Sequence, residues 1–162
     1  MKNPVFNKQH ITEYFTYGFI AAVAYIIPVL FFLKHNEYQN FYYLYIGNGL
    51  FMVVIFSYAY RLVYHPYDKK RAVTMLIAGN MATLAGIIIS LVFDTLSILF
   101  FFPGLVSSLP IDKIVEGAPG TIQLKHPGGL LSMIAIDAVI GNGGMGALIS
   151  VVTAYAGKLN QA

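Results

Sequence analysis

The chain has no cysteine among its 162 residues. Disulfide bonds, catalysis by a thiolate, cysteine-bound clusters and zinc ribbons are therefore excluded. Charge is also scarce, since Asp, Glu, Lys and Arg make up only 10% of the residues, where a soluble domain has roughly 25%. The net charge of +3 is small and gathers near the ends of apolar segments, so it gives no indication of a nucleic-acid partner.

The sequence consists largely of long apolar segments. Hydrophobic residues form 57% of the sequence, and they gather into four stretches of about 20 residues or more, the length that spans a bilayer as a helix. The alternating segments of about ten residues that a β-barrel needs are absent, and a lone span satisfies its own backbone only as a helix. We predict an all-α integral membrane protein, a single domain over 1–162, whose four transmembrane helices form an antiparallel bundle. The predicted spans are 14–33, 41–64, 73–102 and 129–157.

The connections between these spans differ in character. Residues 34–40 are short and polar, which favours a hairpin between the first two helices, and residues 65–71 form a compact basic turn. Residues 103–128 form the one long loop, which is rich in proline. Lys2 and Lys8 precede the first apolar stretch, but no signal-cleavage pattern follows it, so we expect this stretch to be retained as a helix.

The distribution of Lys and Arg predicts the orientation in the membrane, because basic residues accumulate in cytoplasmic segments next to the spans. Seven lie on the side of the termini and the basic turn, and three lie on the side of the long loop. We predict a multi-pass protein of the cell membrane, plasma or inner, with both termini cytoplasmic and the loop extracytoplasmic. The seven are Lys2, Lys8, Arg61, Lys69, Lys70, Arg71 and Lys158, and the three are Lys34, Lys113 and Lys125.

The basic turn also predicts contact with lipid. A basic side chain beside an anionic membrane surface gains roughly 1 kcal/mol. Arg61 lies just inside the end of the second segment, and its long apolar stem allows the guanidinium to reach the headgroups from there. The predicted headgroup-binding residues are Arg61, Lys69, Lys70 and Arg71.

Two aspartates lie inside the apolar segments, Asp94 in the third and Asp137 in the fourth. A charge at the centre of a membrane helix costs about 2.5–3.5 kcal/mol, so such a residue is expected to face a bundle interior, a partner or a water-filled cavity. A helix rises about 1.5 Å per residue, which places both aspartates roughly 12 Å from the outer ends of their segments. Asn48 and Tyr25 lie at about the same depth in the second and first segments. Each helix therefore contributes one polar group to a common layer.

Small residues indicate that both aspartates face other helices. A row of small residues spaced four positions apart along a helix lets another helix approach closely. Asp94 ends a row of this kind, and Asp137 lies beside a similar one in the fourth segment. We therefore place both acids between helices and not against lipid. The row in the third segment is Ala78, Ala82, Gly86, Ser90 and Asp94.

The aspartate pair has a functional and a structural interpretation. Two carboxylates in one low-dielectric layer repel each other, so they do not both ionise easily. The functional interpretation is a proton-exchanging or cation-binding site, with Asn48 and Tyr25 as further oxygen ligands. In the structural interpretation each aspartate is neutral and fixes helix register through hydrogen bonds, or pairs with a basic residue of another subunit.

Four glycines within six residues mark the fourth segment, in Gly141-Asn142-Gly143-Gly144-Met145-Gly146. Three interpretations are open. The segment is a close-packing face for a neighbouring helix, an unwound patch whose backbone meets an ion or substrate, or a bend. A phosphate-binding loop is excluded because neither the preceding strand nor the following Lys-Ser/Thr is present.

The remaining side chains give no sign of catalysis. The four histidines (His10, His35, His65 and His126) lie near segment ends or in connections, which does not suit a membrane haem or a metal site. The sequence has no Ser-His-Asp order, no H-E-x-x-H motif and no nucleophile elbow. We therefore expect no enzymatic activity, no metal and no cofactor.

Two classes of function fit these observations. The first is a non-catalytic polytopic subunit that packs with other subunits into a larger membrane complex. The second is a small proton- or cation-coupled transporter or channel, itself a homo-oligomer, that uses Asp94 and Asp137. The small-residue rows on two helices and the absence of catalytic motifs favour the first class from sequence alone.

Overall fold

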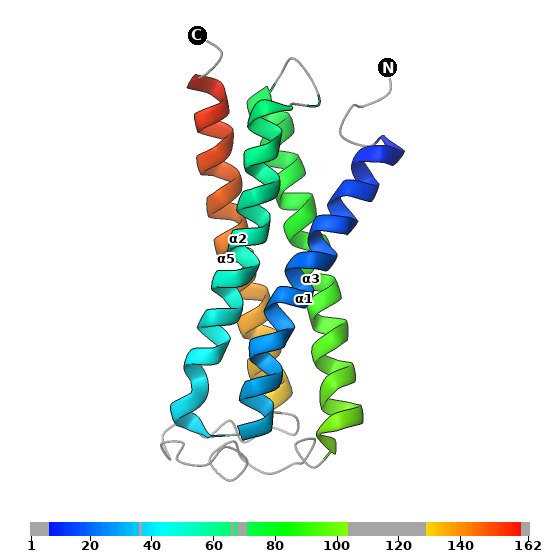
Figure 1. Ribbon diagram of the computed structural model, residues 1–162, viewed down its shortest axis with the longest axis vertical. Coiled ribbons are helices and arrows are strands. Elements are labelled where there is room, and N and C mark those ends of the chain that lie inside the picture. Colours follow the sequence, from blue (N-terminus) through cyan, green and yellow to red (C-terminus); the bar gives the residue numbers. More distant parts are fainter. Residues whose placement is uncertain (1–6, 36, 66, 68–70, 104–128, 160–162) are drawn as a thin grey trace.

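The computed structural model describes residues 7–35, 37–65, 67, 71–103 and 129–159 (Figure 1). Lys69, Lys70 and almost all of the predicted long loop lie outside the described residues. The described part of the chain is helical, as predicted, and four of its helices are long and apolar enough to cross a membrane. The elements are α1 (Lys8–His35), the short 3₁₀ helix η2 (Tyr38–Phe41), α2 (Tyr42–Tyr64), α3 (Arg71–Phe101) and α5 (Gly129–Leu159).

The first helix is longer than its apolar stretch. It begins at Lys8, whereas the hydrophobic pattern predicts a start near residue 14. Helical hydrogen bonding continues through the polar residues at this end, where the Thr12 hydroxyl donates to the Lys8 carbonyl at 3.0 Å and the Thr16 hydroxyl to the Thr12 carbonyl at 2.8 Å. The apolar stretch predicts the membrane-embedded length, and the helix itself extends beyond it.

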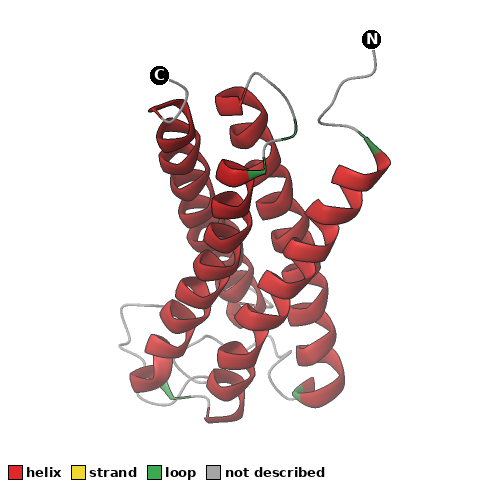
Figure 2. Ribbon diagram, turned by 45° about the horizontal axis from the view of Figure 1, so that its top comes forward, coloured by secondary structure: helices red, strands yellow, loops and turns green. Residues whose placement is uncertain are grey.

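The four helices form one bundle in which α1 and α5 each pack against both α2 and α3. Figure 1 shows the start of α1 and the end of α5 at the same end of the bundle, drawn at the top. The end of α1 and the start of α5 lie at the opposite end, and Figure 2 shows the same arrangement from a second direction. The side chains between the helices are mostly large and apolar, with Tyr25, Phe32, Phe51 and Tyr58 among the largest that are fully buried.

The outer surface of the bundle is apolar as well. A soluble bundle carries charged and polar residues on its outer faces, whereas here exposed leucine, isoleucine, valine and phenylalanine side chains occur on all four helices. Such a surface is matched to hydrocarbon and not to water. Representative exposed residues are Phe19 and Ile27 of α1, Val53 of α2, Ile88 and Val92 of α3, and Ile140 and Val151 of α5.

Helices α1 and α3 approach each other closely at two glycines. A Cβ atom on Gly18 would lie 2.7 Å from the backbone nitrogen of Gly86 and 2.9 Å from the carbonyl oxygen of Ala82. A Cβ atom on Gly86 would lie 3.2 Å from the Gly18 carbonyl oxygen of α1 and 2.7 Å from the ring of Phe51 of α2. Ala82 and Gly86 belong to the small-residue row predicted in the third segment, and this row does face another helix.

Helices α3 and α5 pack through two reciprocal contacts between a glycine and a hydroxyl side chain. Gly79 of α3 faces Ser150 of α5, and Gly146 of α5 faces Thr83 of α3; neither glycine has room for a Cβ atom. The Ser150 hydroxyl donates to the Gly146 carbonyl at 2.7 Å, and the Thr83 hydroxyl donates to the Gly79 carbonyl at 2.9 Å. Each hydroxyl thus fills the space beside the opposite glycine while its polar group stays satisfied within its own helix.

Replacing Gly18 by alanine is expected to lower the free energy of unfolding by about 1–3 kcal/mol, the usual cost of forcing extra volume into a packed contact. The added methyl group would meet backbone atoms of α3, which cannot rotate away. Gly49→Ala is the matched control, because a Cβ atom there has nothing within 4 Å and alanine is the better helix former. Unfolding in detergent micelles, followed by circular dichroism, measures both. An equal effect of the two substitutions would contradict the close contact.

Candidate functional site

The carboxyl group of Asp137 on α5 is hydrogen-bonded to side chains from two other helices. The Tyr25 hydroxyl of α1 donates to its Oδ2 at 3.0 Å, and the Asn48 amide of α2 donates to its Oδ1 at 3.0 Å. Tyr25 is fully buried and Asn48 is 4% exposed. Three of the four residues that the sequence places in one layer are therefore linked by hydrogen bonds across α1, α2 and α5.

Two glycines make room for these hydrogen bonds. A Cβ atom on Gly47 of α2 would lie 3.0 Å from the ring of Tyr25, and one on Gly141 of α5 would lie 2.6 Å from the amide nitrogen of Asn48. Gly141 is one helical turn from Asp137 on the same helix. Asn48 therefore lies against bare backbone of α5, and from there its amide reaches the carboxyl group.

Asp94 of α3 is the fourth member of the layer. It is 1% exposed, and neither of its carboxyl oxygens has a hydrogen-bond partner among the described residues. The helices that carry the two acids, α3 and α5, pack directly against each other. Buried carboxyl groups in proteins are normally paired or hydrogen-bonded. Asp94 thus differs from Asp137, which has a donor on each oxygen.

Other buried polar groups on the same helices also have no hydrogen-bond partner within the described ranges. They are the Ser90 hydroxyl, both amide atoms of Asn142 and the amide oxygen of Asn48. Ser90 lies one turn before Asp94 on α3, and Asn142 follows Gly141 on α5. The core therefore contains more polar donors and acceptors than its own side chains satisfy.

A groove between α2 and α5 reaches this layer from the outer surface. Its volume is about 490 Å³, and Asn48, Asp137 and Gly141 line it together with seven larger side chains. Asp137 is only partly buried, so it borders both the groove and the polar interior. The other lining residues are Phe41, Leu44, Tyr45, Met133, Ile136, Ile140 and Met145.

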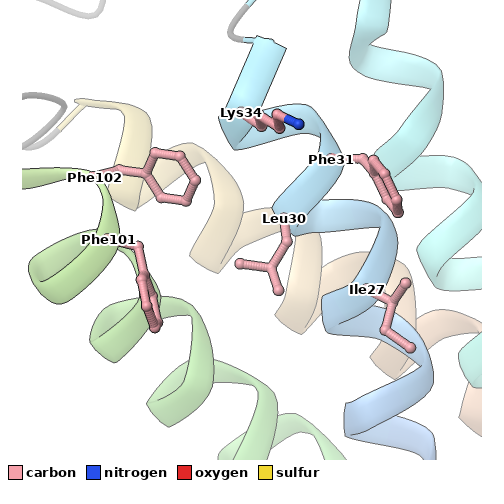
Figure 3. A pocket seen from close by; sticks show the side chains of 6 residues that line it. All are labelled: Ile27, Leu30, Phe31, Lys34, Phe101 and Phe102. Carbon is pink, nitrogen blue, oxygen red and sulfur yellow. The ribbon is translucent and has the colours of Figure 1, made fainter.

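A second hollow, of about 370 Å³, lies between the end of α1 and the end of α3 (Figure 3). Leu30 of α1 and Phe101 and Phe102 at the end of α3 face this space. Lys34 is its one charged lining residue, and neither aspartate lines it. The hollow is therefore separate from the polar layer and offers no acid chemistry.

The glycine-rich segment of α5 stays α-helical from Gly141 to Gly146, so the unwound patch that the sequence left open does not form. Its glycines have different surroundings. Gly141 lies against Asn48 and Gly146 against Thr83, Gly143 makes an ordinary contact with Ile87, and Gly144 faces open space. The segment is a packing face at two of its four glycines, which is one of the three interpretations.

The predicted headgroup-binding residues fall into three groups. Arg61 makes contacts within the protein, to Glu13 at 3.4 Å and to the Tyr17 hydroxyl at 3.4 Å, although its side chain remains 48% exposed. Lys69 and Lys70 lie outside the described residues, and Arg71 is the first residue of α3. For Arg61 the sequence analysis missed the ion pair, because a long side chain that can reach headgroups can equally reach a carboxylate on a neighbouring helix.

Glu13 belongs to a polar cluster that the sequence analysis did not identify. The Tyr67 hydroxyl donates to Glu13 and lies 3.1 Å from the Tyr58 hydroxyl, and the ring of His10 stacks on that of Tyr67 at 3.5 Å. Burial and the hydrogen bond to Glu13 raise the pKa of Tyr67 above its ordinary value. A signal was present: Glu13 is the one acid of the first apolar helix and Arg61 the one base of the second, at corresponding ends.

Comparison with protein-family profiles, with curated protein sequences and with solved structures found no match to this chain. In the part of the chain that the structure describes, no group of three or more His, Asp and Glu side chains is placed to hold a metal ion. The candidate site consists of Asp137 with its two donors, Tyr25 and Asn48, and of the buried Asp94 on the adjacent helix α3.

Leucine at the two aspartate positions should have opposite effects on stability. Asp137→Leu leaves the Tyr25 hydroxyl and the Asn48 amide without an acceptor, which lowers the unfolding free energy by about 1–3 kcal/mol. Asp94→Leu removes a buried carboxyl group that has no hydrogen-bond partner in the described part of the chain, so the unfolding free energy is unchanged or rises by about 1 kcal/mol or more. Unfolding in detergent measures the free energies of both variants. Equal destabilisation by both would mean that Asp94 is tied into the fold in the same way as Asp137.

Proposed function

We propose that this chain is a small membrane transporter or channel that exchanges a proton, or binds a cation, at Asp94 and Asp137 in the helix core. The observation that carries the proposal is Asp94, which is 1% exposed and has no hydrogen-bond partner for either oxygen in the described residues. A residue kept only to fix helix register would be expected to have one. An acid whose partner is a proton or a cation does not need one from the protein.

The acid pair has the physical properties that exchange requires. Two carboxylates that share a low-dielectric helix core do not both remain ionised without a compensating positive charge. The pair therefore takes up one proton or one cation, and Tyr25 and Asn48 hold Asp137 in place as it does so. The polar layer draws on all four helices, so occupancy of the site acts on their packing. The proposed role involves no catalytic step and no cofactor.

A second candidate is the non-catalytic subunit of a larger membrane complex, the class that the sequence favoured. Gly144 supports it, because this glycine lies exposed on the outer face of α5 with open space around it, where another helix can approach closely. Gentle purification separates the two candidates. Foreign subunits in fixed stoichiometry support a complex, and a homogeneous oligomer supports a transporter.

The membrane arrangement belongs to the same proposal. The helices would cross the cell membrane as an antiparallel bundle with cytoplasmic termini, an extracytoplasmic loop at 103–128 and the basic turn against anionic lipid. The count of basic residues supports this orientation. The start of α1 and the end of α5 lie at the same end of the bundle, which supports placing both termini on one side of the membrane (Figure 1).

Neutralising either acid should strongly slow transport. In liposomes that contain a pH-sensitive dye, an imposed gradient of protons or of a permeant cation should drive proton movement through the wild type. Asp94→Asn and Asp137→Asn should each slow the flux about tenfold or more, because loss of a group that carries the transported charge removes more than 1.4 kcal/mol of stabilisation. Glu37→Gln is the control, since Glu37 bonds to Asn40 away from the layer. No flux in the wild type, or unchanged flux in both variants, would rule out proton exchange at the two aspartates.

The absence of cysteine makes the orientation directly measurable. Single cysteines at Lys158→Cys and Lys34→Cys are each the one thiol in the chain. With a maleimide that does not cross membranes, Lys34→Cys should be labelled in intact cells and Lys158→Cys only after permeabilisation. The reverse pattern would mean that the termini lie outside.

A further inference from the structure

We propose that the groove between α2 and α5 takes a lipophilic organic cation directly from the bilayer and brings it to Asp137. This inference rests on the proposed function and specifies the class of substrate. Of the ten residues that line the groove, one is charged, and it is Asp137. A bound positive charge therefore meets one carboxylate and no competing cation in the lining.

The groove opens sideways. Tyr45, Ile136 and Ile140 line it and are also exposed on the outer surface of the bundle. Asp137 lies eight residues into α5, roughly 12 Å along the helix, so the opening is at the depth of lipid tails. A hydrated inorganic ion would lose its water shell in reaching such an opening. A cation with apolar substituents already partitions into the bilayer and needs no aqueous path.

The lining suits a large, soft cation. Phe41 and Tyr45 present aromatic rings, which attract organic cations through their π faces. Met133 and Met145 add flexible, polarisable side chains that adapt to differently shaped apolar groups. The volume of about 490 Å³ lies within the range of pockets that bind small organic molecules, roughly 300–1,000 Å³.

Binding is expected to release a proton. With one proton on the acid pair before binding, a monovalent cation that arrives at Asp137 makes the second negative charge favourable, and the proton leaves. One positive charge enters the site for each that departs, so the net charge buried in the bundle stays constant. Asn48 and Tyr25 stay on Asp137 throughout, because each oxygen has one donor and keeps room for a further partner.

Tetraphenylphosphonium is the probe for this inference. Calorimetry on the full-length protein in detergent should show saturable binding that weakens as pH falls, with up to one proton released per cation in weakly buffered solution. Asp137→Asn should weaken binding about tenfold or more, since an unpaired buried charge costs at least 1.4 kcal/mol. Sodium and lithium should not displace the probe.

Two tryptophan substitutions on α5 provide a matched pair. Ile136→Trp fills the groove from a lining position that is 56% exposed, and it should weaken binding about tenfold or more, a loss of roughly 1.4 kcal/mol. Val139→Trp adds the same bulk at a position that is 47% exposed and does not line the groove, and it should bind as the wild type does.

The outcomes separate this inference from the proposed function. Proton flux without tetraphenylphosphonium binding overturns the groove inference and leaves proton exchange standing. Binding that persists in Asp137→Asn and in Ile136→Trp reports partition into the micelle and also overturns it. Displacement of the probe by sodium would assign the site to small inorganic cations instead. Absence of both flux and binding in the wild type would remove the proposed function itself.

Discussion

A carboxyl group inside an apolar helix bundle must be hydrogen-bonded, paired or protonated, and the arrangement around Asp137 follows from this constraint. Its two oxygens accept hydrogen bonds from α1 and α2, so one side chain sets the relative position of three helices. The same constraint explains the two glycines nearest these hydrogen bonds. Gly47 leaves space for the tyrosine ring and Gly141 leaves space for the asparagine amide.

The two aspartates of the layer differ in their hydrogen bonding and in their accessibility. Asp137 has one hydrogen-bond donor on each oxygen and is partly accessible, whereas Asp94 is enclosed and has no partner within the described residues. An enclosed acid of this kind opposes folding, and the fold tolerates it because apolar packing elsewhere, as around Phe51 and Tyr58, outweighs the loss. A site at which the protein gives up stability is where binding of a small charged species has the largest effect on the structure.

How much was predictable depends on which physical rule governs each feature. Helix rise is nearly constant, so counting residues from the segment ends placed Tyr25, Asn48 and Asp137 at a depth where the structure has them in contact. Helix rotation and side-chain direction follow no such count. The groove beside Asp137, and the lack of a partner for Asp94 among the described residues, therefore appear only in three dimensions. The pairing of Arg61 with Glu13 did have a sequence signal in their positions at corresponding ends of two helices.

The contact between Asn48 and Gly141 restricts how this chain can diverge. Any larger residue at position 141 displaces the amide, and any smaller residue at position 48 opens a void beside α5 and takes a donor from Asp137. Single replacements at either place thus damage the same hydrogen bond by different routes. The two positions are expected to covary, so that an alignment of descendants would show asparagine and glycine kept together or exchanged together.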